Sequence, residues 1–205
     1  MAFHLASHPL ADQWMTVLRD RTSDRAAFRS AAWRLSQWVA LEATRDIPTV
    51  AKRVDTPLES TEGRVVSVPV TVVPILRAGL AMAEPILELF PGAAMGHVGL
   101  ARDEATAEAA AYYCRLPEDG AGLVLVVDPM LATGGSLIAA LDRVRASGAR
   151  EIRALSLVAA PEGIAAVAAA HPAVALYGAA VDRELDERKY IRPGLGDFGD
   201  RWCGA

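Results

Sequence analysis

Residues 128–136 combine side chains and backbone groups that suit a phosphate group. They read Asp-Pro-Met-Leu-Ala-Thr-Gly-Gly-Ser and lie between an apolar run, residues 123–127, and an amphipathic pattern, residues 137–147, that Gly148 ends. Glycines let the main chain approach an anion closely, and the N–H groups of a helix N-terminus point toward it. An acid that directly follows a buried strand lies where open α/β sheets bind their ligands. The segment therefore predicts a phosphate cradle with Asp128 beside it.

Other phosphate-binding motifs do not fit this segment. It has no Gly-Lys-Ser/Thr ending, as a Walker motif would, and it lacks the G-x-G-x-x-G dinucleotide fingerprint. Gly-Gly-Ser alone is more typical of a tight strand–helix turn capped by serine. The whole segment instead resembles the loop with which type I phosphoribosyltransferases, in the form carried by uracil phosphoribosyltransferases, hold the 5-phosphate of phosphoribosyl pyrophosphate (PRPP). The resemblance implies PRPP contacts for Asp128, Pro129, Met130, Leu131, Ala132, Thr133, Gly134, Gly135 and Ser136.

A second apolar run ends in an arginine. Residues 73–79 read Val-Pro-Ile-Leu-Arg-Ala-Gly, and a helix is expected to follow. The forked guanidinium group of Arg77 suits a pyrophosphate, and the small residues Ala78 and Gly79 keep the backbone close. A pair between Arg77 and a nearby acid such as Glu84 explains the arginine equally well. In the resembled family Ile-Leu-Arg-Ala-Gly is the pyrophosphate loop, which assigns Arg77, Ala78 and Gly79 to PRPP.

Residues 101–106, Ala-Arg-Asp-Glu-Ala-Thr, resemble the flap motif of the same family. By that resemblance Arg102 meets PRPP phosphates when a β-flap, expected within residues 102–116, closes. Ala101 departs from the motif where an aromatic residue is usual, and Ala105 departs where a second acid is usual. Arg115 replaces a common lysine, which keeps the charge and changes its geometry. A solvated charged turn is the competing interpretation of Arg102.

Residues 190–201 suit recognition of a flat polar ring. They read Tyr-Ile-Arg-Pro-Gly-Leu-Gly-Asp-Phe-Gly-Asp-Arg, too irregular for helix or strand and rich in backbone donors and acceptors. They resemble the family's uracil-recognition segment, the hood, although a structural C-terminal wrap would explain them as a lone motif. Lys189 replaces a common glycine and is poor at positive φ, and Arg192 replaces an aliphatic residue, so the hood turn is expected to differ. The resemblance assigns uracil to Tyr190, Ile191, Gly196, Asp197 and Phe198, with Asp197 also contacting PRPP.

The whole chain of 205 residues is expected to form one domain. We expect a helical region over about 1–45, a polar connection over 46–62, a core over about 65–181 and the hood over about 182–205. Residues 65–73 indicate a strand or hairpin with Pro69 at an edge or strand start, and alternating strands and helices follow. The predicted fold class is α/β, a type I phosphoribosyltransferase-like twisted parallel sheet flanked by helices, with a β-flap and a C-terminal hood loop. Candidate packing residues of the helical region are Trp14, Leu18, Phe28, Leu35, Trp38 and Leu41.

Composition limits the partners. A net charge of −4 without a long basic run argues against nucleic-acid binding. Residues 163–181 lack charge, but alanine dominates them and His171-Pro172 interrupts them, so a helix and a strand are expected rather than a membrane span. No secretory signal is visible at the start, and the distant Cys114 and Cys203 suit a reduced cytoplasm. The four histidines lack zinc-ligand spacing, so no structural metal site is expected.

Together the motifs predict transfer of phosphoribose from PRPP to uracil, giving UMP and pyrophosphate in pyrimidine salvage. Asp128, Arg77 and Arg102 would act on the reacting groups. Because Pro129 stands where many type I enzymes carry a second acid, Mg²⁺ would be held mainly by PRPP and water, without a strong protein ligand. Uracil must lose its N1 proton, and positioning is preferred over a general base, although Asp197 is a candidate base.

Partners and alternatives complete the expectation. A homo-oligomer, dimer or tetramer, is expected, because exposed apolar residues in the N-terminal region would suit a dimer. The resemblance implies GTP as an effector in some members. A phosphoribosyltransferase for another base stays open because Lys189 and Arg192 alter the hood. A regulatory protein that binds PRPP or UMP without turnover stays open because Ala101 and Ala105 weaken the flap motif.

Overall fold

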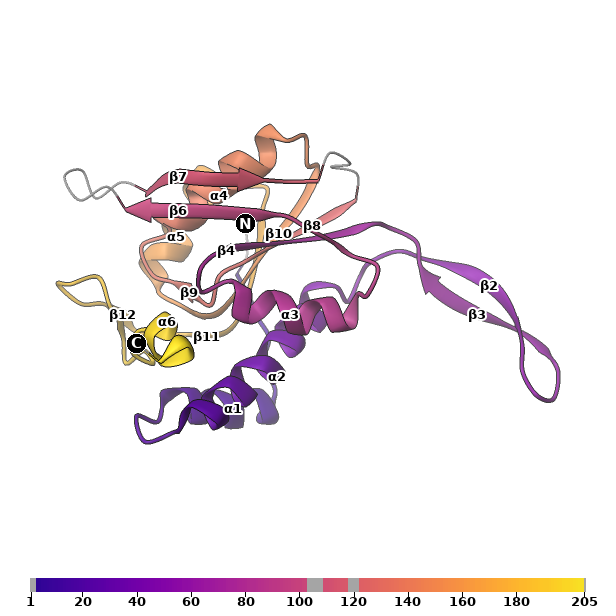
Figure 1. Ribbon diagram of the computed structural model, residues 1–205, viewed down its shortest axis with the longest axis horizontal. Coiled ribbons are helices and arrows are strands. Elements are labelled where there is room, and N and C mark those ends of the chain that lie inside the picture. The colour runs from indigo at the N-terminus through magenta and orange to yellow at the C-terminus, as the bar shows by residue number, and fades with distance from the viewer. Residues whose placement is uncertain (1–2, 103–108, 118–121, 205) are drawn as a thin grey trace.

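The computed structural model describes residues 3–102, 109–117 and 122–204, which build a mostly parallel sheet with helices on both faces (Figure 1). The strand order is β1-β11-β10-β8-β4-β6-β7, and β7 alone in this order runs antiparallel to its neighbour. The predicted fold class is confirmed in this respect. The strands are β1 (Phe3–Leu5), β4 (Val70–Leu76), β6 (His97–Arg102), β7 (Ala109–Arg115), β8 (Leu123–Val127), β10 (Glu151–Ala159) and β11 (Ala175–Val181), with the short β5 (Ala94–Met95) and β9 (Met130–Leu131) at its margins.

Each face of the sheet buries its own layer of helices. Helices α1 (Pro9–Arg19), α2 (Arg25–Ala43) and α3 (Leu80–Leu89) cover one face, and α4 (Gly135–Ala146) and α5 (Pro161–Ala170) cover the other. Strand β8 shows why its sequence is uniformly apolar: Leu125 packs with the first group of helices and Val126 with the second. The strand ends at Asp128, so the sheet delivers this acid to its carboxyl edge.

The N-terminal helices have local stop and start signals. His8 caps α1 through an acceptor nitrogen that takes the Leu10 N–H at 3.1 Å, and Asp24 caps α2 by accepting the Ala27 N–H at 2.7 Å. Leu18, Phe28 and Leu35 are fully buried, as predicted, and Trp14 and Trp38 pack at the margin of the same core.

One packing prediction in this region is wrong. Leu41 is 50 % exposed. Helix α2 buries a stripe that includes Leu35, Val39 and Ala43. Leu41 is two positions, roughly 200°, from Val39 around the helix, which places it on the solvent side.

Residues 46–62 were predicted to be a connection, and the structure corrects this. Strands β2 (Thr49–Asp55) and β3 (Ser60–Val66) pair antiparallel and project away from the sheet as a hairpin, in purple in Figure 1. Almost every residue of the hairpin is exposed, so neither face shows the apolar alternation that marks a half-buried strand. Val65 and Val66, predicted to belong with residues 67–73, are instead the last residues of β3. Pro69 directly precedes β4, which agrees with its predicted place at a strand start.

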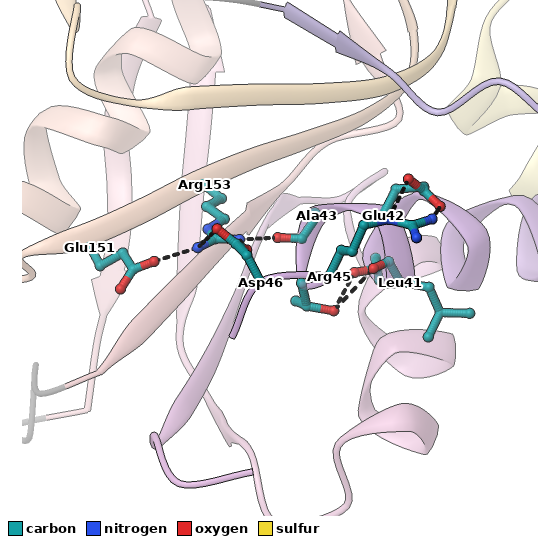
Figure 2. Close-up of polar contacts among 9 residues, drawn as sticks. Leu41, Glu42, Ala43, Arg45, Asp46, Glu151 and Arg153 are labelled. Atoms are coloured by element: carbon teal, nitrogen blue, oxygen red, sulfur yellow. Dashed lines mark hydrogen bonds and ion pairs between the residues drawn. The ribbon is translucent and has the colours of Figure 1, made fainter. Parts of the chain in front are cut away.

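A buried arginine fastens the end of α2 to the sheet (Figure 2). Arg153 lies within β10 and is 8 % exposed. Its guanidinium group donates to the carbonyl of Ala43 at 2.5 Å, to Asp46 at 2.5 Å and to Glu151 at 2.5 Å. These hydrogen bonds hold the pKa of Asp46 below its usual range, with Arg153 as the main cause. The charge inside an otherwise apolar strand is thus paired rather than isolated.

The C-terminal segment contains regular structure that was not predicted. Strands β12 (Glu184–Leu185) and β13 (Ile191–Arg192) form a small hairpin, and α6 (Phe198–Cys203) follows. Asp197 caps α6 by accepting the Asp200 N–H at 2.9 Å, and the Phe198 ring lies 5.2 Å from that of Phe28. Helix and strands are too short to show a periodic pattern. In the described part of the chain no helix has the length and apolar character to cross a bilayer.

Candidate active site

A cavity of about 590 Å³ opens at the carboxyl edge of the sheet. Three parts of the chain line it: the loop after β4, the loop after β8, and the hood. This volume suits a small metabolite. Eleven predicted site residues line it together, namely Arg77, Ala78, Asp128, Met130, Ala132, Thr133, Tyr190, Ile191, Gly196, Asp197 and Phe198.

A smaller cavity of about 160 Å³ adjoins the first at the start of α4. Asp128 and Thr133 line both cavities, whereas Gly134 and Ser136 line the smaller one. Gly134 has φ of +85° and no side chain caps the N-terminus of α4, so the first N–H groups of this helix are free to bind an anion. The smaller cavity therefore has the geometry of a phosphate subsite.

Asp128 is the carboxylate at the junction of the two cavities. Burial raises its pKa from 3.8 to about 7, and a single backbone hydrogen bond, donated by Met130 at 3.3 Å, opposes the shift. Near neutral pH the group thus interconverts between its neutral and its charged form. Such a pKa at a cavity junction is typical of an acid that meets a ligand.

Arg77 projects from the loop between β4 and α3. The Leu76–Arg77 peptide is cis, and the Arg77 side chain is exposed to the cavity. Among the described residues Arg77 forms no ion pair, so the alternative pair with Glu84 is not seen. A Cβ on Gly79 would lie 2.5 Å from the carbonyl oxygen of Val127, so only glycine lets this loop pack on β8.

Three predicted PRPP residues lie away from both cavities. Gly79 and Pro129 are buried and Gly135 is exposed at the first position of α4, and none of the three lines either cavity. Arg102 ends β6, whose antiparallel pairing with β7 forms the flap that was predicted. The Arg102 side chain and residues 103–108, including Ala105, lie outside the described residues. Arg115 pairs with His97 at the base of the flap.

The hood turn keeps a left-handed residue. Lys189 has φ of +67°, a conformation in which a side chain carries a steric cost. Ile191 and Phe198 are 4 % and 1 % exposed and face the cavity from the hood side, whereas Tyr190 is half exposed.

The N-terminal helices contact the hood through residues that were not predicted to do so. Asp182 follows β11 and is 6 % exposed. It accepts two hydrogen bonds from Arg19, at 2.8 and 2.5 Å, and one from the Gly194 N–H at 2.8 Å. Arg201 adds hydrogen bonds to the carbonyls of Leu195 and Asp20, both at 2.7 Å. A buried network thus sets the position of the hood relative to α1.

Sequence reasoning also missed Ser156. This residue lies in β10, is 3 % exposed, and shares the sheet face of Ile152 and Ala154, toward α4. It lines the smaller cavity together with the loop after β8. A hydroxyl within the apolar run of residues 154–159 was the available signal.

Comparisons with known proteins agree with this geometry. A family model described as uracil phosphoribosyltransferase matches residues 5–205. A protein from Listeria innocua named uracil phosphoribosyltransferase is 47 % identical over 204 residues, which cover 98 % of each chain. Another of that name from Symbiobacterium thermophilum is 47 % identical over 200 residues, covering 97 % of this chain and 96 % of that one.

Solved structures extend the likeness to three dimensions. The AQ2163 protein from Aquifex aeolicus superposes with a TM-score of 0.92 at 34 % identity, covering 98 % of this chain and 97 % of that chain. Adenine phosphoribosyl transferase from Trypanosoma brucei, solved with AMP, pyrophosphate and ribose-5-phosphate, gives a TM-score of 0.57 at 10 % identity, over 88 % of this chain and 83 % of that one. The second likeness concerns the fold alone.

Proposed function

This chain belongs to the uracil phosphoribosyltransferase family, and on that premise we propose how its residues hold PRPP and uracil and join them. The reaction transfers phosphoribose from PRPP to uracil and gives UMP and pyrophosphate, a step of pyrimidine salvage. One observation carries the assignment of residues: a single cavity brings Asp128 and Arg77, each at a strand end, opposite Ile191 of the hood.

Each loop takes one part of the substrates. The free N–H groups at the start of α4, with Thr133 and Ser136, receive the 5-phosphate in the smaller cavity. Arg77 receives the pyrophosphate through its guanidinium fork, and Arg102 approaches from the flap. The main chain of Ile191 and of residues 196–198 reads the polar edge of uracil.

The chemistry breaks the bond between C1 of the ribose and the pyrophosphate oxygen and forms a bond from C1 to N1 of uracil. Positive charge develops on the ribose while negative charge develops on the pyrophosphate. The Asp128 carboxylate stabilises the positive charge on the ribose and accepts hydrogen bonds from the ribose hydroxyls. Arg77 stabilises the negative charge on the pyrophosphate.

The N1 proton of uracil leaves for water in this proposal, without a side-chain base. Asp197, the one candidate base, already uses an oxygen to cap α6, which supports a positioning role for it. Uracil held against C1 in the reactive orientation provides the rate enhancement.

Magnesium would fit this site with few protein ligands. Within the described ranges no cluster of three or more histidine, cysteine or acidic side chains could hold a metal ion. Asp128 is the carboxylate nearest the phosphate loop, so PRPP oxygens and water would supply most ligands of a hard cation. Mg²⁺ bound in this way offsets the negative charge of the pyrophosphate.

Turnover tests the proposal directly. Purified protein with PRPP and Mg²⁺ is expected to release pyrophosphate with uracil and not with other bases. Turnover with another base only would show that the altered hood changes base choice. Tight UMP binding without pyrophosphate release would instead establish a regulatory protein. Adding GTP to the same assay tests the effector that the resemblance implies.

Ser156→Ala is expected to raise the KM for PRPP and the Kd for UMP about five- to tenfold, the cost of one ordinary hydrogen bond. The reason is its hydroxyl at the floor of the smaller cavity, within reach of a phosphate or of a water bound to it. The KM for uracil should not change. Steady-state kinetics with each substrate varied checks this, with Ser147→Ala, at the far end of α4, as the matched control. Equal effects on both substrates would rule out a phosphate contact.

Assembly and location complete the proposal. We propose a homo-oligomer, because the projecting hairpin exposes Val50, Val54 and Leu58, the last at 95 %, and such apolar groups favour burial against another chain. Sedimentation velocity distinguishes dimer from tetramer. A cytoplasmic location is supported by Cys114 and Cys203, both free and exposed, which suit a reducing compartment.

A further inference from the structure

The hood turn contains a strained residue beside an unusual ion pair. Lys189 is the one non-glycine residue with positive φ in the described chain, at +67°. A Cβ makes this conformation costly, so the surrounding contacts must stabilise the turn. The turn joins β12 to β13, whose register pairs Glu184 with Arg192 and Leu185 with Ile191.

Asp186 supplies those contacts. One of its carboxylate oxygens accepts the N–H groups of Arg188 and Tyr190, at 2.9 and 3.0 Å. The other accepts the Nε–H of Arg192 at 2.8 Å and a second contact from the same guanidinium group. The backbone N–H of Lys189 also donates to the Asp186 carbonyl at 2.8 Å. Asp186 therefore bonds to residues on both sides of Lys189.

Arg192 acts from behind the site rather than in it. It lines an adjoining hollow of about 280 Å³ with Asp186 and Pro193, and it is not among the residues that line the main cavity. The two hollows share Arg188, Tyr190, Ile191 and Gly196. Its neighbour Ile191 is buried and faces the main cavity, where the proposed function has it contact uracil. On the other edge of the hairpin, Glu162 of α5 accepts the Leu185 N–H at 2.9 Å, which anchors β12. The free end of the hairpin is the one that Arg192 holds.

We propose that Asp186 and Arg192 form a clasp that keeps the uracil-reading strand in place against the strain at Lys189. Both are positioning residues and neither contacts the reacting atoms. The inference rests on the proposed role of Ile191 in uracil binding. It implies that the clasp is needed because position 189 carries a side chain, so glycine at 189 should make Arg192 dispensable.

A mutant cycle with two readouts tests the clasp. Arg192→Ile is expected to raise the KM for uracil about five- to tenfold, with the KM for PRPP unchanged. Adding Lys189→Gly to Arg192→Ile should remove most of the rise in uracil KM. The double variant is compared with Lys189→Gly alone, because that substitution also removes a charge from the cavity. Arg192→Lys keeps the charge and loses the forked guanidinium group, so its uracil KM should lie between those of wild type and Arg192→Ile. Arg183→Ile is the control, because Arg183 forms a more exposed pair with Glu184 outside the turn.

Hydrogen exchange separates failure of the clasp from failure of the proposed function. In the ligand-free protein the amides of residues 186–192 should lose protection in Arg192→Ile and regain it in the double variant. Unchanged exchange and unchanged uracil KM in Arg192→Ile would overturn the clasp, as would a double variant impaired as much as the single one. Loss of protection in a protein that never turns over uracil would uphold the clasp and overturn the proposed function instead.

Discussion

Asp128→Asn is expected to lower kcat about 10²- to 10³-fold while making the free protein more stable at alkaline pH. The kinetic loss follows because an amide cannot offset positive charge on the ribose. The gain in stability follows because the partly buried position of the wild-type carboxylate disfavours its charged form and raises its pKa to about 7. Function and stability therefore oppose each other at this residue.

The sign of the stability effect follows from proton linkage. Between pH 3.8 and about 7 the folded chain keeps a proton on Asp128 that the unfolded chain has lost, so wild-type stability falls as pH rises through this window. The loss is complete above about pH 7 and amounts to at most about 4 kcal/mol, from roughly three pKa units. Asparagine does not ionise, so the variant should match wild type near pH 4 and exceed it at pH 8.

Urea unfolding at pH 4.5 and pH 8 measures this difference, and Asp12→Asn, an exposed acid on α1, provides the control. In wild type, kcat/KM for PRPP should rise about tenfold per pH unit below the pKa and level off above it, since the charged form is the active one. A variant no more stable at pH 8 than wild type would show that the Asp128 carboxylate is hydrated. Retained turnover would remove Asp128 from the mechanism.

Asp128 also shows what a sequence reveals about a site. Its residue type and its place after an apolar run predict a ligand-binding acid, and the structure places it at the cavity junction. The pKa near 7 was not predictable, because it depends on how the loops after β4 and β8 and the hood enclose the carboxylate. Ser156 was missed for a related reason, since its hydroxyl becomes a cavity group only where β10 meets the loop after β8 and the start of α4.

The fold shows the same division. Buried strands such as β8 and the core stripe of α2 leave periodic patterns, and they were predicted correctly apart from Leu41. The hairpin of β2 and β3 was missed because no buried face gives it a pattern. The contacts of Asp186 with Arg192 at the hood turn were not predicted, because the two residues meet only when β12 and β13 pair.

Asp182→Ala is expected to destabilise the protein by about 3–5 kcal/mol, the cost of breaking a buried ion pair. The change leaves Arg19 without its counter-charge and the Gly194 N–H without an acceptor. Because Gly194 lies in the hood, the surviving folded protein should bind uracil more weakly while its KM for PRPP changes little. Urea unfolding and steady-state kinetics with each substrate varied measure the two effects, with Arg45→Ala, an exposed partner of Glu42, as the control.

Asp182→Asn separates the two losses, because the amide oxygen still accepts the Gly194 N–H while the charge is gone. If the backbone bond positions the hood, uracil KM should stay near wild type in this variant even though stability falls. If the ion pair to α1 positions it, uracil KM should rise in Asp182→Asn and in Arg19→Ala alike, with a coupling energy of about 1–3 kcal/mol between the two sites. Arg19 and Asp182 are 163 residues apart in the chain, so the second outcome would make the N-terminal helices part of base recognition. A normal uracil KM in all of these variants would show that α1 stabilises the fold but does not position the hood.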